Sequence, residues 1–527
     1  MLLYQINNGG VSFSDTLISS MDDSNLRFQL EAVVPGVFDA YDSLKSHDGM
    51  GLHTSSGSFY NHTLFGRDGS MAAKFVTGFD YDVAVETIVA LTALQGTKYD
   101  TRTQEEPGRI HHELRDFHTW KGKLSERLFF WLLHSAWSIH DYRLLSYFGI
   151  DETALYVRLV HKYVKHDAAI LLKRVTNHHG EVVTVAESLV AAARWIISKL
   201  DNDGLLVEGR SNRTSIPFQT FQDSVTAYAR TDGSLADAKG NMSYVEIQAF
   251  AADALNDMVE MFPGHELAGE WKDAALRVQG ALFDKFWQPQ EAFFASSIDS
   301  KGVIDTRNIS AGWTLNTLLW EVLDSQTQAE YISPIVQRLF SDEFLTSVGL
   351  RTKSKDQPSP IVEVIGYHCA EVVWPMFTFM VVEGLRRHRL YNLAQQLENR
   401  ILNGLNAIGN FNEFFIVLRD GTVVIPDIKG ADGKINVQMP PEKRIAFSVV
   451  PAIVLAWRAG RKDDLPEPNE WQRDLETKIM KQIDHVERYE PDKAIDGIGP
   501  VKRMRLRRWA GLLITAKYLV RERKKLL

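Results

Sequence analysis

Apolar residues recur at helical spacing through most of the chain. Ile332, Ile335, Val336, Leu339 and Phe340 occupy positions i, i+3, i+4, i+7 and i+8, the pattern of a helix with one buried face. We therefore expect an all-α chain of about a dozen helices. The same spacing is found in the segments 81–95, 123–137, 151–165, 184–200, 247–258, 266–286, 311–323, 371–387, 393–408, 446–459 and 506–520.

Strand-like alternation is short and rare. Phe415–Leu418 and Thr422–Ile425 alternate on either side of Asp420-Gly421, which predicts a small hairpin. We expect the few strands of this chain to lie within loops rather than to build a sheet of their own.

Some connections between the predicted helices are long and rich in aromatic and acidic residues. Loops longer than about 12 to 15 residues in a compact protein are usually functional. A closed ring of helix pairs, with these loops gathered at one mouth, accommodates the pattern. A stacked helical solenoid is the rival, but no repeat of suitable length is visible. The loops in question are 96–118, 201–242, 341–370 and 409–446.

No change in composition divides the chain. The only linker-like stretch is Asp463–Glu470, and helical patterns continue beyond it, so we expect a single catalytic domain over 1–527. The 527 residues are 45% hydrophobic and 24% charged, which is ordinary for a globular protein. The 59 basic and 67 acidic residues give a net charge of −8, which argues against nucleic acid as the main partner.

Several features indicate a cytoplasmic protein without a membrane partner. No window approaches the roughly 20 apolar residues of a membrane span. The first residues, MLLYQINNGG, lack the basic and apolar regions of a secretory signal. Cys369 is the only cysteine, which excludes an intramolecular disulfide and fits a reducing compartment.

Motifs for nucleotide binding, an α/β-hydrolase elbow or a metal are missing. The chain has no P-loop, no G-x-G-x-x-G after a strand and no G-x-S-x-G. His111, His112, Glu113 and His118 crowd together, but the paired histidines of H-E-x-x-H are absent, so we expect no metal.

Two further patterns have ordinary structural interpretations. Asp201–Gly204 does not match a calcium loop and predicts a turn at a helix end. The basic segments Lys502–Arg508 and Arg521–Lys525 predict solvated helix faces.

Two loops carry residues suited to sugar chemistry. Arg67 and Asp68 are adjacent, and a guanidinium beside a carboxylate can hold neighbouring hydroxyls as donor and acceptor. A helix N-cap formed by Asp68 is an equally good interpretation from spacing alone. Asp223 lies among aromatic residues, and apolar surroundings raise the pKa of a carboxyl toward that of a general acid.

Six motifs in order resemble one enzyme clan. The chain resembles the α-glycosidases that include the glucosidase domain of glycogen debranching enzymes, glucoamylases, and mannosylglycerate- and oligosaccharide-processing enzymes, most strongly over residues 60–460. This resemblance implies an (α/α)6 toroid and an inverting hydrolase that needs neither a metal nor an organic cofactor. The matching segments are Phe65–Ser70, Glu105–Arg115, Tyr147–Leu155, Phe221–Ser224, Tyr367–Pro375 and Glu413–Phe414.

The resemblance also implies roles for individual residues. Asp223 matches the general acid and Glu413 the general base, whose carboxyl groups an inverting mechanism holds about 6.5 to 9.5 Å apart. Arg67 and Asp68 match the clamp on the sugar whose bond is cleaved. Further pocket residues implied by the resemblance are Glu113, Tyr147, Asp151, His368 and Trp374.

The chain departs from the family pattern at three places. Gly69 precedes Ser70 in the first motif, and Phe221 replaces a tryptophan near the acid. The segment from Tyr367 to Trp374 is one residue longer and lacks a glycine, and it contributes an extra carboxylate, Glu371. These changes leave the reaction type standing and put the substrate in doubt.

The expected substrate is an oligosaccharide or small glycoside. We expect an exo-acting α-glucosidase on α-1,6-linked or short α-gluco-oligosaccharides. The alternative is an α-mannosyl- or α-glucosylglycerate hydrolase, in which Arg109, Arg115 or Arg351 would bind the carboxylate. A sugar epimerase using histidines and a non-catalytic sugar-binding protein are alternatives of other classes. The sequence does not indicate the oligomeric state.

Overall fold

Helices are the main regular structure of the described chain, as the spacing of apolar residues predicted. The computed structural model describes residues 24–56, 60, 62–116, 137–140, 143–210, 215–224, 226–357, 365–425, 441–459, 465–483 and 495–496. The helices are α1 (Ser24–Val33), α2 (Val37–Asp42), α3 (Gly66–Val76), α4 (Tyr81–Ala93), α6 (Glu152–Val164), α7 (Val185–Ser198), α8 (Val245–Met261), α9 (Ala268–Phe286), α10 (Ser310–Trp313), α11 (Ser325–Leu339), α12 (Pro375–Arg387), α13 (Tyr391–Ile408), α14 (Ala446–Ala459) and α15 (Glu470–Ile483). Short 3₁₀ turns are η1 (Ala168–Leu172), η2 (Thr314–Asn316) and η3 (Leu318–Trp320).

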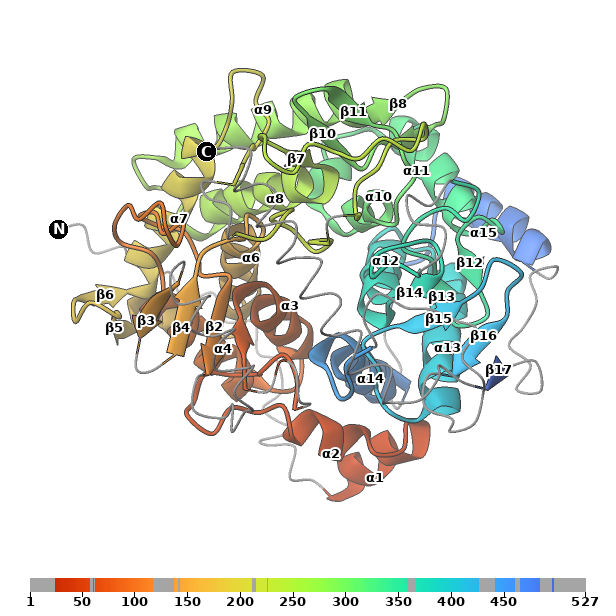
Figure 1. Cartoon of the computed structure of the whole chain (residues 1–527), viewed down its shortest axis with the longest axis horizontal. Coiled ribbons are helices and arrows are strands. Elements are labelled where there is room, and N and C mark those ends of the chain that lie inside the picture. The colour runs from red at the N-terminus through yellow and green to blue at the C-terminus, as the bar shows by residue number, and fades with distance from the viewer. Residues whose placement is uncertain are drawn as a thin grey trace, which may run out of the picture.

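Six helices contact one another in sequence order around the middle of the molecule (Figure 1). Helix α3 packs on α6, α6 on α8, α8 on α10, α10 on α12 and α12 on α14, and α14 returns to α3. Helices α4, α7, α9, α11 and α13 lie outside them in the view of Figure 1. The composition of α14 explains its inner position. The helix is apolar on nearly all sides, and every residue from Ala446 to Ala456 is buried.

Helix boundaries follow local signals in the sequence. Thr184 and Glu187 form a capping box at the start of α7, with hydrogen bonds of 3.2 and 2.7 Å between side chains and backbone amides. Pro375 begins α12, so the helix starts four residues later than the predicted stripe at 371. Gly409 ends α13 in the left-handed conformation, with φ of 70°.

The predicted helix 311–323 is wrong as a single element. The structure instead places α10, η2 and η3 there, because Thr317 is extended, with φ of −135° and ψ of 164°. The carboxylate of Asp253 accepts a 2.7 Å hydrogen bond from the Leu318 amide and fixes the restart. The predicted stripe 506–520 and the basic segments near the C-terminus lie outside the described residues, as does nearly all of 123–137.

The strands are short and belong to the loops, as expected. The predicted hairpin is β15 (Phe415–Val417) with β16 (Val423–Ile425), an antiparallel pair. One four-stranded sheet has the order β1-β2-β4-β3, another β14-β15-β16-β17, and a three-stranded sheet β11-β10-β7. The remaining bounds are β1 (Leu64–Phe65), β2 (Glu113–Asp116), β3 (Ser138–His140), β4 (Arg143–Ser146), β5 (Arg174–Thr176), β6 (Val182–Thr184), β7 (Ser243–Tyr244), β8 (Trp287–Gln288), β9 (Phe293–Phe294), β10 (Ser297–Asp299), β11 (Gly302–Ile304), β12 (Leu345–Thr346), β13 (Gly349–Leu350), β14 (Val372–Val373) and β17 (Ile495–Asp496).

The helices that the structure describes differ from membrane spans in length or in apolar content. None of them is both long and apolar enough to cross a bilayer.

Candidate active site

Buried charged residues gather at the N-terminal ends of the inner helices. Arg67 and Asp68 lie in the first turn of α3, Asp151 lies directly before α6, and Glu246 lies in the first turn of α8. All four are buried. Buried charges are rare unless they are paired or functional, so this concentration marks a candidate site.

The turn from β1 into α3 requires a glycine. A side chain at Gly66 would place its Cβ 2.1 Å from the carbonyl oxygen of His111. The same approach lets the Gly66 amide donate a 3.0 Å hydrogen bond to the carbonyl of His112. Gly66 therefore allows the loop 96–112 to pack directly against the two charged residues that follow it.

Arg67 is fixed by two carboxylates and an aromatic ring. Its Nε lies 3.4 Å from Asp68 Oδ1 and its Nη1 lies 3.4 Å from Asp151 Oδ2. Its Cζ lies 5.0 Å from the centroid of the Phe221 ring, within cation–π range. Phe221 thus presents an aromatic face to Arg67 at the position where the family pattern has tryptophan.

Asp68 does not cap the helix. Residue 65 occupies the N-cap position of α3, and no described side chain caps the backbone there. The second carboxylate oxygen of Asp68 accepts a 3.0 Å hydrogen bond from the Thr54 hydroxyl. Of the two interpretations open from the sequence, the contacts favour the polar clamp over the N-cap.

Two carboxyls adjacent in the sequence, Asp151 and Glu152, lie near Arg67. Asp151 and Glu152 are both fully buried, and Glu152 Oε1 lies 2.6 Å from His112 Nδ1. Burial, followed by the proximity of Glu152, raises the pKa of Asp151 well above its ordinary value, and Arg67 offsets part of this rise. The two carboxyls therefore favour sharing a proton over carrying two charges.

The loop that carries Asp223 is anchored to the starts of α8 and α10. Gln222 and Asn308, just before α10, exchange two side-chain hydrogen bonds of 2.8 Å each. The Thr220 hydroxyl donates a 3.0 Å hydrogen bond to Glu246 Oε1. These bonds anchor the segment that leads into Asp223 to two of the inner helices.

The surroundings of Asp223 suit a proton donor. Burial raises the pKa of its carboxyl, while the positive Arg67 and the His112 ring lower it in part. A carboxyl with a raised pKa keeps its proton closer to neutral pH, which is what a general acid requires.

Glu413 follows the end of α13 and is clamped by two segments. Its amide donates a 2.8 Å hydrogen bond to the Glu442 carbonyl, and the Glu442 amide donates one of 3.1 Å to Glu413 Oε2. The Tyr367 hydroxyl donates to Glu413 Oε1. Burial raises the pKa of Glu413 to about 8, and the hydrogen bonds from Tyr367 and Glu442 offset part of that rise.

Asp68 lies near both of the carboxyls that the family motifs match, Asp223 and Glu413. It interacts electrostatically with Asp223 and also with Glu413. The phenol groups of Tyr60 and Tyr367 likewise each interact with both carboxyls. Five groups from segments far apart in the sequence therefore belong to one polar cluster.

Aromatic rings form one side of this cluster. The imidazole of His368 stacks on the indole of Trp374 with centroids 5.6 Å apart and planes 11° apart, and Tyr367 meets the same indole edge-on at 5.1 Å. His368 Nδ1 lies 3.0 Å from the hydroxyl of Ser224, next to the proposed acid. Burial lowers the pKa of His368 well below its ordinary value, which keeps the ring neutral.

Two predicted pocket residues have their described contacts elsewhere. Glu113 accepts a hydrogen bond from the Arg115 side chain and lies opposite Phe65 in the sheet. Tyr147 is fully buried in a small apolar cluster, and its hydroxyl donates a 2.9 Å hydrogen bond to the Leu94 carbonyl. Their roles in binding stay predictions, and Tyr147 supports the sheet behind the site.

The arginines expected to bind a substrate carboxylate have partners within the protein. Arg109 donates a 2.8 Å hydrogen bond to the Gly149 carbonyl, and Arg351 donates one of 2.7 Å to the Val417 carbonyl. Arg115 pairs with the carboxylate two residues before it. Arg109 and Arg351 each hold a loop in place, while the Arg115 guanidinium lies within cation–π range of the Tyr60 ring, 5.8 Å from its centroid.

Sequence reasoning did not single out Lys353, which lies beside the acid loop. Its ammonium group is buried and donates a 3.3 Å hydrogen bond to the Thr226 carbonyl. Burial lowers its pKa to about 8, and its charge acts on the imidazole of His368. An ammonium group has three donors, so Lys353 retains capacity for an anionic partner.

The extra carboxylate of the longer motif lies at the side of the site. Glu371 Oε1 accepts a 2.8 Å hydrogen bond from Arg419, whose other donors reach the carbonyls of Lys355 and Gln357. Glu371 thereby joins the β14–β15 strands to a neighbouring loop. The pairing identifies this longer segment as a structural turn.

The comparison with protein families indicates a glycoside hydrolase. Residues 158–417 match the family described as the Mannosylglycerate hydrolase MGH1-like glycoside hydrolase domain, a range that includes Asp223 and Glu413. This match over about half of the chain confirms the resemblance predicted from the motifs.

Solved structures share the fold at low sequence identity. A GH63 mannosylglycerate hydrolase from Thermus thermophilus in complex with glucose superposes with a TM-score of 0.52 at 15% identity, covering 80% of this chain and 100% of that one. The same enzyme with Tris and D-glycerate gives a TM-score of 0.50 at 14% identity, covering 82% and 99%. An uncharacterized conserved protein from that organism gives 0.52 at 16%, covering 80% and 100%. No curated protein sequence matches this chain.

Proposed function

We propose that the protein is an inverting hydrolase of small α-glycosides, with an α-mannosyl- or α-glucosylglycerate as the best-supported substrate. Asp223 is the general acid and Glu413 the general base. We also propose that the fold is an (α/α)6 toroid, which the closed circuit of helix contacts from α3 to α14 supports. The observation that carries the proposal is a continuous set of contacts between the two carboxyl segments. Tyr367 donates to Glu413, its ring lies 4.6 Å from that of His368, and His368 lies 3.0 Å from the hydroxyl of Ser224, the residue after Asp223.

The proposed reaction moves two protons. Asp223 donates its proton to the glycosidic oxygen as the bond from the anomeric carbon to that oxygen breaks. Glu413 accepts a proton from a water molecule whose oxygen bonds to the anomeric carbon from the opposite face. Arg67 and Asp68 hold sugar hydroxyls and stabilise the flattened, positively charged sugar in the transition state. The products are a free alcohol and a sugar of inverted configuration.

The hydrogen-bond partners of Glu413 suit a base that must aim at water. The Tyr367 hydroxyl and the Glu442 amide occupy one site on each carboxylate oxygen. The carboxylate is therefore oriented before substrate binds, and each oxygen has a second lone pair for water. Both hydrogen bonds stabilise the ionised form against the effect of burial.

Lys353 favours a substrate with an acidic leaving group. The general acid protonates the leaving-group oxygen, so the aglycone lies on the side of Asp223. Lys353 bonds to the carbonyl of Thr226, three residues beyond that acid. A buried ammonium at this place would pair with the carboxylate of glycerate, which agrees with the family match.

The other classes of function have less support. Burial, followed by the charge of Arg67, lowers the pKa of His112 to about 4, which does not suit an epimerase acid near neutral pH. A non-catalytic binding protein would have no need for a carboxyl with a raised pKa beside the arginine clamp, as Asp223 is. The α-glucosidase on short or α-1,6-linked oligosaccharides remains the competing substrate assignment.

The test is sugar release from a panel of α-mannosylglycerate, α-glucosylglycerate, isomaltose and maltotriose, followed by proton NMR. We expect release from a glycosylglycerate and a first-formed β-anomer. Cleavage of the oligosaccharides alone would transfer the assignment to the α-glucosidase. A first-formed α-anomer would refute inversion, and release by Asp223→Asn at the native rate would refute the assignment of the acid.

A further inference from the structure

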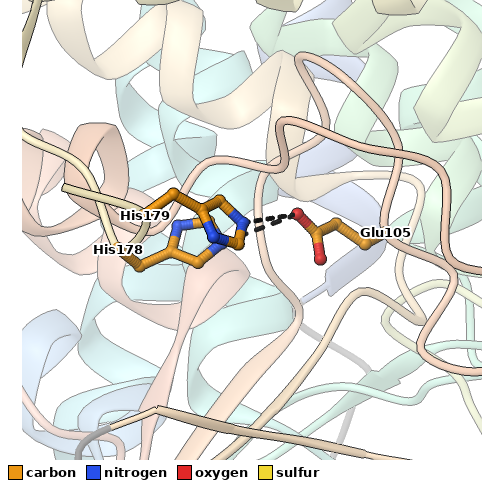
Figure 2. Close-up of side chains that lie close together, drawn as sticks. All are labelled: Glu105, His178 and His179. Carbon is orange, nitrogen blue, oxygen red and sulfur yellow. Dashed lines mark ion pairs between the residues drawn. The ribbon is translucent and has the colours of Figure 1, made fainter. Parts of the chain in front are cut away.

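Two neighbouring imidazoles and a carboxylate lie close together outside the polar cluster that contains Asp223 and Glu413. His178 and His179 lie in the turn between β5 and β6, and Glu105 lies in the loop between α4 and β2 (Figure 2). Glu105 Oε1 lies 3.5 Å from His178 Nε2 and 3.6 Å from His179 Nε2. The three donor atoms all lie within 4.8 Å of one another.

These distances are too long for direct hydrogen bonds and suit an ion between the groups. N–H···O hydrogen bonds have donor–acceptor distances of about 2.7 to 3.2 Å. Around a tetrahedral Zn²⁺ with bonds of about 2.0 to 2.1 Å, neighbouring donor atoms lie about 3.3 to 3.4 Å apart. The two separations in this site are close to that second value.

The orientation of His178 is that of a metal ligand. Its Nδ1 lies 3.1 Å from the Ala93 carbonyl, which can only accept, so the proton is on Nδ1. The lone pair of Nε2 therefore points toward Glu105, and this buried nitrogen has no hydrogen-bond partner among the described residues. A histidine that donates one ring N–H to a backbone carbonyl and presents the other nitrogen is the usual arrangement at zinc sites.

The backbone around the two histidines is well determined. Asn177 Oδ1 accepts hydrogen bonds of 3.0 and 2.9 Å from the amides of His179 and Glu181, which closes the turn. The amide of Thr97 donates a 3.1 Å hydrogen bond to Glu105 Oε1.

The neighbouring His111 provides an independent sign of a missing polar partner. It is fully buried, and within the part of the chain that the structure describes neither of its ring nitrogens has a hydrogen-bond partner. Its ring interacts electrostatically with that of His178, although its nitrogens are not among the three converging donor atoms. Buried polar atoms without partners are rare, and a bound ion with its water would supply one.

We propose that Glu105, His178 and His179 bind one Zn²⁺ ion in a non-catalytic site whose fourth ligand is water. His179 is 34% exposed, which gives the ion an entry path. The ion would join the β5–β6 turn to the loop 96–112, whose far end packs on Gly66. The site would thereby stabilise the loop that supports Arg67, and the proposal stands whether or not the proposed substrate is correct.

The test is a titration of the whole chain, freed of metal by chelation, with ZnCl2 by calorimetry and with CoCl2 by visible absorption. We expect one equivalent of each ion to bind, the intense visible bands of tetrahedral Co²⁺, and a higher melting temperature with Zn²⁺. Glu105→Gln, His178→Gln and His179→Gln should each weaken Zn²⁺ binding more than about 100-fold, beyond the loss typical of an outer-shell residue.

The matched control is His166→Gln. This exposed histidine stacks on Tyr81 outside the cluster, so its removal should leave the affinity unchanged. His179→Gln keeps the proposal testable if the buried variants fail to fold, because its side chain is partly exposed. Absence of saturable uptake by the native chain, or equal uptake by His179→Gln and His166→Gln, would overturn the site.

Discussion

The guanidinium of Arg67 lies over the ring of Phe221, 5.0 Å from its centroid. Phe221 also packs against Trp313 at 5.1 Å and is almost fully buried. Packing against Trp313 therefore fixes the Phe221 ring, and the ring in turn positions the Arg67 guanidinium. Replacement of the family's tryptophan by phenylalanine keeps an aromatic face for Arg67 and removes the five-membered ring of the indole with its N–H.

Phe221→Leu should lower kcat/KM about tenfold, because a cation–π contact contributes about 1 kcal/mol and Arg67 would lose its orientation. Steady-state kinetics on the best substrate measure the effect. Phe283→Leu, in a cluster of aromatic rings on α9, should lower the melting temperature without changing kcat/KM. An equal loss of kcat/KM in both variants would show that Phe221 acts only through stability.

Asp223→Asn should slow hydrolysis of alkyl glycosides by at least about 10³-fold, since it removes the proton that the leaving oxygen needs. A dinitrophenyl glycoside leaves without that proton and should lose far less. The exposed Asp232→Asn, in the same long loop, is the control and should retain full activity. Equal losses on both kinds of substrate would remove Asp223 from the role of acid.

Glu413→Gln should abolish turnover of alkyl and dinitrophenyl glycosides alike, because both reactions need an activated water. It should also change how stability depends on pH. Folding raises the pKa of Glu413 from its ordinary value of 4.5 to about 8, so its contribution to stability is complete below pH 4.5 and is lost as the pH rises through 8.

Glutamine does not ionise, so Glu413→Gln should gain stability relative to the native chain as the pH rises from about 5 to about 9. Melting temperatures measured across that range test the sign. Glu330→Gln, on the exposed face of α11, should run parallel to the native chain. A difference between Glu413→Gln and the native chain that is constant with pH contradicts the burial of an ionising group.

Lys353→Met should raise KM for glycosylglycerates about 10- to 100-fold and leave neutral glycosides unaffected, because a hydrogen bond to a charged group contributes about 1.5 to 3 kcal/mol. The pKa of about 8 adds a second signature, since affinity for the acidic substrate should fall as the pH rises through 8. Lys355→Met removes a lysine paired with Asp342 and is the matched control. No selective effect on acidic substrates would exclude Lys353 from the aglycone site.

The sequence predicted long elements better than contacts between them. Regular stripes located α9, α11 and α13, because each buries one continuous face. The break at Thr317 was missed, because the Asp253 carboxylate that restarts the chain comes from another helix. The boundary near 375 was shifted because an apolar stripe continues through β14 into α12.

The site residues divide in the same way, between those that a local motif marks and those that only the folded chain brings together. Local motifs pointed to Arg67, Asp223 and Glu413 through residue type and order, and their roles stay predictions. Lys353 carries no motif, and its place beside Thr226 depends on two loops meeting in space. The cluster of Glu105 with His178 and His179 joins segments more than 70 residues apart, which no spacing rule for metal ligands covers.

Thr54 connects the two ends of the helical circuit. Its carbonyl accepts a 2.8 Å hydrogen bond from the amide of Ala446, the first residue of α14, while its hydroxyl holds Asp68. Contacts between residues so distant in the chain form late in folding, because closing a long loop costs entropy before the contact is gained. The proposed clamp of Arg67 and Asp68 is thus complete only when α14 has docked on α3. Recovery of hydrolysis during refolding should therefore lag behind recovery of the helical circular dichroism signal.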